Sequence, residues 1–310
     1  MLSGLYQQGY ATGYILAALF YLALVPTTDP SPGWRTLFWF GAGPPILIIV
    51  FRLCLPETQR FRSLKAERQD ASTNDTSGSD NDLQEKKDGF WSYLKGAAKV
   101  LQANWVLFIY MVFLMAGFNF STHGSQDLYP IYLTTQLGMS PSHVTIITVV
   151  GQISCVLGGI VIGYLSSILG RRLSIVCVCV LGGALLPSYI LLTDMTLVVG
   201  AILEQFCVGG AWGPVPIHLQ ELAPPVLRTL MVGLTYQLGN LASSASATIE
   251  ATIGERFPLP PTDSGTHRYN YGKVIGIFMA TVWVYLTCLV LVGPEMSEEE
   301  RADISEEITQ

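Results

Sequence analysis

The stretch VTIITVVGQISCVLGGIVIGYLSSI, residues 144–168, decides the fold class, because it runs for 25 residues without a charged side chain. An α-helix rises 1.5 Å per residue, so about 20 apolar residues cross the hydrocarbon core of a bilayer. Apolar and polar residues do not alternate here, and in lipid only helices and closed barrels satisfy every backbone group. The stretch therefore predicts a transmembrane helix.

Seven further apolar runs have the same character, which predicts an all-α integral membrane protein with about eight transmembrane helices in a lipid bilayer. The composition agrees, because only 13% of the residues are charged, against about 25% in soluble domains. The eight predicted spans are 4–25, 37–55, 105–133, 144–168, 173–192, 197–217, 229–253 and 271–292.

Polar segments divide the chain into four parts. Residues 1–55 hold two spans, 56–104 form a central loop predicted to be cytosolic and largely disordered, 105–292 hold six spans, and 293–310 form an acidic tail. Lys and Arg favour the side of the central loop by about three to one. The positive-inside rule then predicts that both termini are cytosolic.

Several function classes are disfavoured by the residues. The net charge of −6 comes with no basic surface for nucleic acid. All six cysteines fall in apolar runs, which favours packing thiols over disulfides or metal ligands. We expect no cofactor and no metal. No Gly-x-Ser-x-Gly elbow or His-Glu-x-x-His helix is present, so we expect no enzyme and no catalytic residue.

One span contains an unusually polar string, NFSTHGSQDLYP, residues 119–130. An aspartate at the centre of a transmembrane helix costs roughly 2.5 to 3.5 kcal/mol on insertion scales. The polar side chains should therefore face a cavity or one another. A substrate path is one interpretation, and a hydrogen-bonded seam between helices is the other.

Helical geometry orders these polar residues. At 100° per residue, Asn119, His123 and Gln126 fall within an arc of about 60°. Asp127 lies at the edge of this arc, and Ser125 faces elsewhere. One polar stripe on an apolar helix favours the substrate path, whereas a seam would rarely gather His, Gln and Asp together.

The span 229–253 carries a second polar stripe that includes Gln237 and Asn240. We expect these two side chains to face the same cavity as the first stripe. Packing of small serine and alanine residues against a neighbouring helix is the alternative.

Two carboxyl groups lie inside predicted spans, and an intramembrane carboxyl group is a functional candidate by default. Glu204 lies deep in its span and could carry a proton. Glu250 lies near the outer end of its span, where it could carry a proton or simply meet water.

Loop motifs resemble those of the major facilitator superfamily. In GYLSSILGRR, residues 163–172, the cytosolic loop signature is matched by Gly163, Leu165, Gly170, Arg171 and Arg172. Ser167 stands where the signature usually has an acid. A tight turn requires glycine, and the arginines would hold the loop at the inner surface.

Two further strings fit the same superfamily. In ELAPPVLR, the residues Glu221, Pro224 and Arg228 match its Glu-x-x-Pro-x-x-x-Arg motif after helix ten, and LPETQR, residues 55–60, is similar to the end of helix six. The resemblance implies that this chain holds helices five to twelve of a twelve-helix transporter and is truncated at its N-terminus.

The polar string itself is similar to the signature of the fungal Jen-type lactate/pyruvate permeases, Asn-x-x-Ser/Thr-His-x-Ser-Gln-Asp-x-x-x-Thr. Ile131 stands where the closing Thr is expected. The matching residues are Asn119, Thr122, His123, Ser125, Gln126 and Asp127.

The resemblance implies proton-coupled transport of small monocarboxylates, such as lactate, pyruvate or acetate, across the plasma membrane. In this hypothesis His123 or Asp127 takes the proton, and Asn119, Gln126 and Gln237 offer hydrogen bonds to the carboxylate. The deep parts of the spans contain no Lys or Arg, so protonated His123 or a cation in the preceding helices would supply positive charge. A transporter of a sugar or dicarboxylate and a non-functional truncated fragment are the alternatives.

Overall fold

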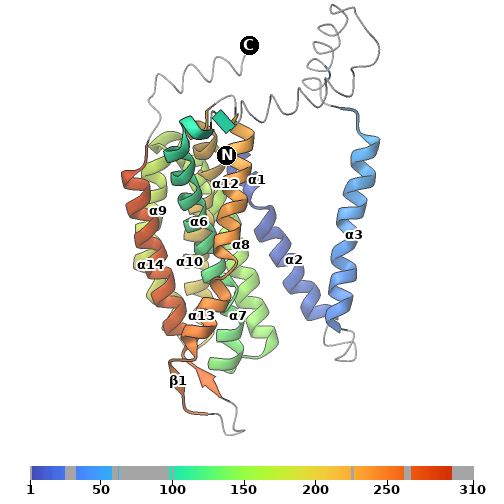
Figure 1. The fold of residues 1–310 in the computed structure, drawn as a ribbon. Helices are drawn as coiled ribbons and strands as arrows, with labels where there is room; N and C mark the ends of the chain where they lie inside the picture. Colours follow the sequence, from blue (N-terminus) through green and yellow to red (C-terminus); the bar gives the residue numbers. More distant parts are fainter. Residues whose placement is uncertain are drawn as a thin grey trace, which may run out of the picture. The chain divides into compact units, whose positions relative to one another are not determined.

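The computed structural model describes residues 2–24, 33–57, 62, 98–99, 101–224, 227–261 and 267–294 (Figure 1). The chain divides into one unit of residues 1–22 and 104–310 and a second unit of residues 23–103. Nearly all of the predicted central loop 56–104 and of the acidic tail 293–310 lies outside the described residues. Their predicted disorder therefore remains a prediction.

Nearly all of the described elements of the larger unit are helices, and the longer ones run side by side as a bundle (Figure 1). A pair of two-residue antiparallel strands joins the last two helices. The elements are α1 Leu2–Gln7, α2 Gly9–Leu24, α6 Trp105–Gln126, α7 Tyr129–Ile131, the π-helix η1 Tyr132–Gln136, α8 Pro141–Leu169, α9 Arg171–Ile190, α10 Leu197–Trp212, α11 Val215–Leu222, α12 Arg228–Ser243, α13 Ser246–Gly254, β1 Pro258–Leu259, β2 Arg268–Tyr269 and α14 Tyr271–Val292. The smaller unit contains α3 Gly33–Cys54.

Within the described residues, six helical segments are long and apolar enough to cross a membrane. They are Arg35–Cys54, Trp105–Gln136, Pro141–Leu169, Arg171–Ile190, Leu197–Leu222 and Tyr271–Val292. The prediction of an all-helical membrane protein is confirmed, and six of the eight predicted spans correspond to these segments.

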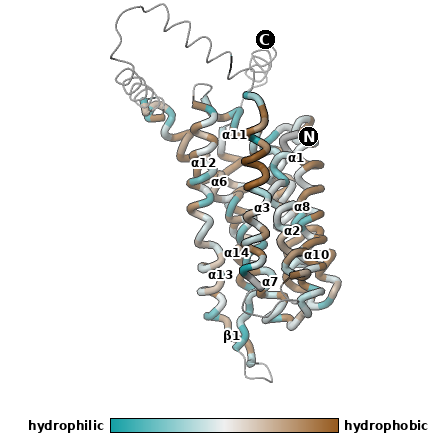
Figure 2. Tube along the Cα trace, turned by 90° about the vertical axis from the view of Figure 1, so that its right-hand side faces the viewer, coloured by the Kyte–Doolittle hydropathy of each residue, from teal (hydrophilic) through white to brown (hydrophobic). Residues whose placement is uncertain are grey.

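The two remaining predicted spans, 4–25 and 229–253, are helical but interrupted. The first is broken by a turn at Gln8, between α1 and α2. The second is broken between α12 and α13, where the hydroxyl groups of Ser243 and Ser244 bond to backbone carbonyls of the same helix at 3.1 and 2.7 Å. Such local bonds compete with the helical ladder and bend helices. Figure 2 shows that this stretch is also less hydrophobic than α10.

Glycines bring α8 and α10 into backbone contact. A Cβ atom added at Gly158 would collide with the carbonyl oxygen of Phe206, and one added at Gly209 would collide with that of Cys155. Small residues at such contacts allow close packing of transmembrane helices, where van der Waals contact drives association. This close pair forms one side of the region in which the site lies.

The predicted loop motifs meet at one end of the bundle. Gly170 has φ of +91°, a conformation that favours glycine, and it begins the turn into α9. Arg171 Nε lies 3.3 Å from Glu221 Oε1, and Arg171 Nη1 donates to the Ser166 carbonyl at 2.7 Å. Arg172 donates to two terminal carbonyls of α14, those of Val290 at 2.9 Å and Leu291 at 2.6 Å. The two arginines therefore link the start of α9 to the ends of α8, α11 and α14.

Two further residues of these motifs lie in helices. Gly163 lies inside α8 and not in the turn, and its backbone packs against Gly4 of α1. Arg228 starts α12, and its Nε and Nη2 atoms are buried without a hydrogen-bond partner among the described residues.

Candidate functional site: a polar cavity beside α6

A cavity of about 240 Å³ lies within the larger unit, between α6 and the helices that face it. Pockets for drug-sized ligands measure about 300–1,000 Å³, so this one suits a smaller molecule. Its lining residues are Gln7, Gln8, Tyr10, Ala11, Asn119, Thr122, His123, Gln126, Cys155, Val208, Gly209, Trp212, Tyr236 and Asn240.

The α6 wall of the cavity is a continuous helical stripe. Asn119, Thr122, His123 and Gln126 follow the spacing i, i+3, i+4 and i+7, which places them on one face of the helix. The structure thus brings together three residues of the predicted stripe and adds Thr122. Two of the four also bond to α10, so the stripe both lines a cavity and forms part of a helix seam.

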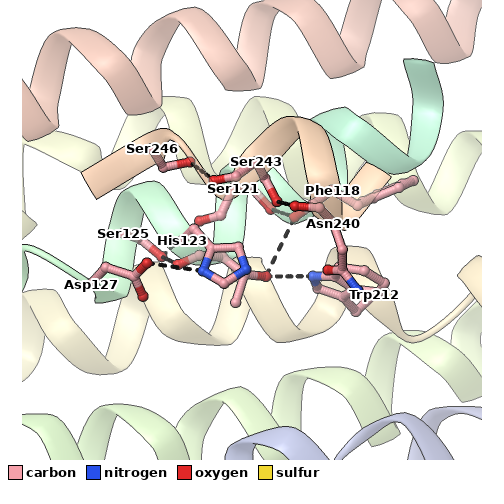
Figure 3. A network of polar contacts seen from close by, with 10 residues as sticks. Phe118, Ser121, His123, Ser125, Asp127, Trp212, Asn240, Ser243 and Ser246 are labelled. Carbon is pink, nitrogen blue, oxygen red and sulfur yellow. Dashed lines mark hydrogen bonds and ion pairs between the residues drawn. The ribbon is translucent and has the colours of Figure 1, made fainter. Parts of the chain in front are cut away.

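His123 and Asp127 form a half-buried pair on successive turns of α6 (Figure 3). His123 Nδ1 lies 2.9 Å from Asp127 Oδ2, and the two side chains are 27% and 34% exposed. If this contact is a hydrogen bond from the ring to an ionised carboxylate, the ring donates from Nδ1, and Nε2 is left for other partners. Asp127 is not among the residues that line the cavity, but it contacts His123, which is.

Thr122 links α6 to α10 at the cavity wall. Its hydroxyl accepts a hydrogen bond of 2.7 Å from the indole nitrogen of Trp212. Trp212 also packs its ring against Phe118 and Tyr236, at centroid distances of 5.6 and 6.0 Å. The Thr122 hydroxyl is thereby engaged within the protein, and the Trp212 ring covers one side of the cavity.

Asn119 and Ser125 use their side chains differently. Asn119 donates one N–H to the Met115 carbonyl at 2.8 Å and lines the cavity. The Ser125 hydroxyl bonds to the carbonyls of Ser121 and Thr122 at 2.8 and 3.1 Å, within its own helix. Ser125, a candidate for the substrate path through its match to the permease signature, is not among the residues that line the cavity, in agreement with its predicted direction on the helix wheel.

The family of sugar (and other) transporters matches residues 1–303 of this sequence. The chain belongs to this family, within the major facilitator superfamily. It is therefore a multi-pass membrane protein of a transporter family and not an enzyme.

Curated relatives of this transporter chain carry names of carboxylic acid transporters. The carboxylic acid transporter protein homolog of Saccharomyces cerevisiae is 40% identical over 297 residues, which are 95% of this chain and 48% of the yeast protein. The cis,cis-muconate transport protein of Acinetobacter baylyi is 26% identical, over 81% of this chain and 56% of that protein. The sialic acid transporter NanX of Escherichia coli is 24% identical, over 92% of this chain and 60% of that protein. The chain thus spans about half the length of these relatives.

Of the two main residues of the second predicted stripe, Gln237 and Asn240 on α12, one lines the cavity. Asn240 lines the cavity, whereas Gln237 is exposed on α12 and is not among the lining residues. Tyr236 takes the place that Gln237 was expected to fill. Tyr236 and Asn240 are four residues apart and share a helix face, and the large ring occupies the wall.

Glu204 is fully buried between α10 and α14, away from the cavity lining. Its Oε1 accepts a hydrogen bond of 2.9 Å from Trp283 Nε1. Its Oε2 is buried without a hydrogen-bond partner in the described part of the chain. Its deep position in the membrane and its proton-carrying role both remain predictions.

Glu250 does not meet water, which was one of the two alternatives for it. The residue is fully buried on α13, and neither carboxyl oxygen has a hydrogen-bond partner among the described residues. Its carboxyl group lies against Gly124 of α6, because a Cβ added at that glycine would come within 3.4 Å of Glu250 Oε1.

Several residues at the cavity were not singled out from the sequence. Trp212 and Tyr236 lie in runs that read as ordinary apolar spans, and Gln7 and Gln8 precede any polar stripe. One signal was available, because buried Trp and Tyr side chains usually require a hydrogen-bond partner. The sequence does not say which helix supplies that partner.

Proposed function

We propose that this chain takes part in proton-coupled transport of small monocarboxylates, of the lactate, pyruvate or acetate type, across the plasma membrane. The observation that carries the proposal is the cavity beside α6, with His123 in its wall. The relatives support the carboxylate class, since carboxylic acid, cis,cis-muconate and sialic acid all contain a carboxyl group.

His123 is central because an anion needs positive charge in a low-dielectric site. Among the described residues that line the cavity, it is the one that can become a cation near neutral pH, since the ordinary pKa of histidine is about 6.5. Asp127 pairs with the ring and stabilises the imidazolium form. Proton and carboxylate would then enter the cavity together as a neutral pair.

Amide groups would complete the carboxylate site. Asn119 has a second N–H beyond the one given to Met115, and Asn240 lines the cavity from α12. Both can donate to a carboxylate oxygen. Gln237, which was expected from the sequence to donate to the carboxylate, is not assigned this role, because it is not among the residues that line the cavity.

The proposal includes an orientation in the membrane. The bundle end that holds Arg171, Arg172 and Arg228 would face the cytosol, by the positive-inside rule. Binding in the cavity would then bias the rocking movements by which transporters expose a site to either side.

The test is a binding titration of the purified full chain in detergent micelles, with tryptophan fluorescence as the readout because Trp212 lines the cavity. We expect lactate to change the fluorescence more strongly at acid than at neutral pH. Lactamide, which has no carboxyl group, should have little effect. His123→Ala should weaken acid-pH binding by about tenfold or more, as for loss of a charged hydrogen bond.

Gln237→Ala is the matched control, since this exposed side chain is outside the cavity lining. The absence of any lactate response at both pH values would overturn the proposal. Tighter binding of glucose than of lactate would instead support a sugar transporter.

A further inference from the structure

A chain of hydrogen bonds connects Gln126 in the cavity wall to two other helices. Gln126 Nε2 on α6 donates to Gln205 Oε1 on α10 at 2.8 Å, and Gln205 Nε2 donates to the Tyr189 hydroxyl on α9 at 3.2 Å. The Tyr189 hydroxyl donates to the Ser125 carbonyl, back on α6, at 2.7 Å. All four residues are buried.

The Ser125 carbonyl, at the end of this series of hydrogen bonds, determines which group donates in each of them. The Ser125 carbonyl oxygen can only accept, so Tyr189 must donate its single hydroxyl proton there. The Tyr189 oxygen then accepts from the amide nitrogen of Gln205, which turns the Gln205 oxygen toward Gln126. Gln126 must therefore present its amide nitrogen to Gln205. Networks of this kind are the basis on which amide nitrogen and oxygen are told apart.

With its amide nitrogen bonded to Gln205, Gln126 has its side-chain oxygen left, which is a hydrogen-bond acceptor. Its Oε1 is buried and has no hydrogen-bond partner among the described residues, and the residue is only 3% exposed. A buried acceptor left unpaired is costly, so a ligand that donates a hydrogen bond to it gains affinity over one that does not.

The space around Gln126 allows an organic ligand on one side only. On the other side lies a second cavity of about 10 Å³, which Gln126 shares with Gln152, Tyr189 and Gln205. That volume is about the minimum for a single water molecule. A ligand of several heavy atoms would therefore meet Gln126 from the larger cavity.

Neighbouring residues pack against two side chains of this hydrogen-bonded series, Tyr189 and Gln205. The rings of Tyr129 and Tyr189 stack at 4.1 Å with an interplanar angle of 9°. Gly151 of α8 lies against Gln205, since a Cβ added there would be 3.3 Å from Gln205 Cγ. The stacked ring thus packs against Tyr189, and the Gln205 side chain packs close to the backbone of Gly151.

We propose that Gln205 and Tyr189 are positioning residues that hold Gln126 as a hydrogen-bond acceptor, so that the cavity selects carboxylic acids that bring an O–H donor. This inference rests on the proposed transport of monocarboxylates and names the chemistry of the ligand. The O–H group is either the 2-hydroxyl of a hydroxy acid or the acidic proton of a neutral carboxyl group. The hypothesis in which Gln126 donates to the carboxylate is thereby replaced.

The test compares lactate with propionate, which lacks the hydroxyl group, in fluorescence titrations of the purified full chain at acid and neutral pH. If the 2-hydroxyl is the donor, lactate binds roughly tenfold tighter than propionate at both pH values, as for one hydrogen bond to a buried acceptor. If the acid proton is the donor, the two ligands bind alike and both prefer acid pH. Gln205→Leu and Tyr189→Phe should reduce whichever preference is present.

A conservative variant separates positioning from structure. The carboxyl group that Gln205→Glu introduces can, when protonated, accept from Gln126 and donate to Tyr189, so at acid pH this variant should keep the wild-type preference. Gln237→Leu, on the exposed face of α12, is the matched control. Should Gln205→Leu fail to fold, Tyr189→Phe decides, because it removes a single atom.

Two failures are distinguishable. An unchanged ligand or pH preference in Tyr189→Phe and in folded Gln205→Leu would overturn this inference while leaving carboxylate binding intact. If the wild-type chain binds neither lactate nor propionate, the proposed function fails, and this inference fails with it.

Discussion

His123 Nδ1 lies 2.9 Å from Asp127 Oδ2, one turn apart on α6, at the border of the cavity. The pair brings a carboxylate to the ring without placing that carboxylate in the cavity. An imidazolium paired in this way can face an incoming anion while its own countercharge stays behind it.

Replacing this countercharge tests the pair. Asp127→Asn keeps the shape but removes the negative charge, so the imidazolium form loses a charge-assisted hydrogen bond worth about 1.5–3 kcal/mol. We expect lactate binding at acid pH to weaken by about tenfold or more, with little change at neutral pH. The pH dependence of the fluorescence titration measures this. A profile identical to the wild type would separate Asp127 from proton binding.

The bond between Thr122 and Trp212 predicts a stability effect. In Thr122→Val the indole N–H of Trp212 loses its acceptor inside the bundle, which should lower the free energy of unfolding by about 1–3 kcal/mol. Thr122→Ser keeps the hydroxyl and is the control. Denaturant unfolding in detergent would show both effects. Equal stability of the valine and serine variants would mean that this bond contributes nothing.

Glu204 and Trp283 predict opposite results for two substitutions. Trp283→Phe leaves a buried carboxyl group without its donor, and we expect a loss of about 1–3 kcal/mol in unfolding free energy. Glu204→Gln keeps an acceptor for Trp283 and should retain stability. Thermal unfolding compares the two. If Glu204→Gln also abolished the pH dependence of lactate binding, Glu204 would be a proton carrier in addition to a structural partner.

The contact between α8 and α10 predicts a large effect from one methyl group. Gly209→Ala places a Cβ against the Cys155 carbonyl, where only backbone movement can relieve the clash. We expect a loss of more than about 1 kcal/mol and a lower yield of folded protein. Gly183→Ala is the control, because its Cβ would meet its nearest neighbour at an ordinary 3.8 Å. Similar yields for both variants would contradict the close contact.

The helical framework and the α6 stripe could be predicted because both depend on local spacing. Apolar runs of membrane length define the spans, and the i, i+3, i+4 and i+7 positions define a face. The interruption at Ser243 and Ser244 was not predicted, because serine is also common where transmembrane helices pack together. Only the structure shows that the serine hydroxyl groups bond to the helix backbone.

Partners across helices could not be predicted. Gln237 and Tyr236 differ by about 100° on the helix, and which of them reaches the cavity depends on how α12 is rotated against α6. The amide direction of Gln126 depends on Gln205 and Tyr189, which are 79 and 63 positions away in the sequence. The sequence places Glu250 near the end of a span, and only the structure shows that it is buried on α13.

The accessibility of the α6 face to water tests the central claim most directly. In a chain whose native cysteines are replaced, Asn119→Cys and His123→Cys should react with a water-soluble, membrane-impermeant thiol reagent, and lactate should slow both reactions. Ser125→Cys, on the side turned away from the cavity, should stay unreactive. Inert thiols at positions 119 and 123, or equal reactivity at 125, would show that this face does not line a water-filled path.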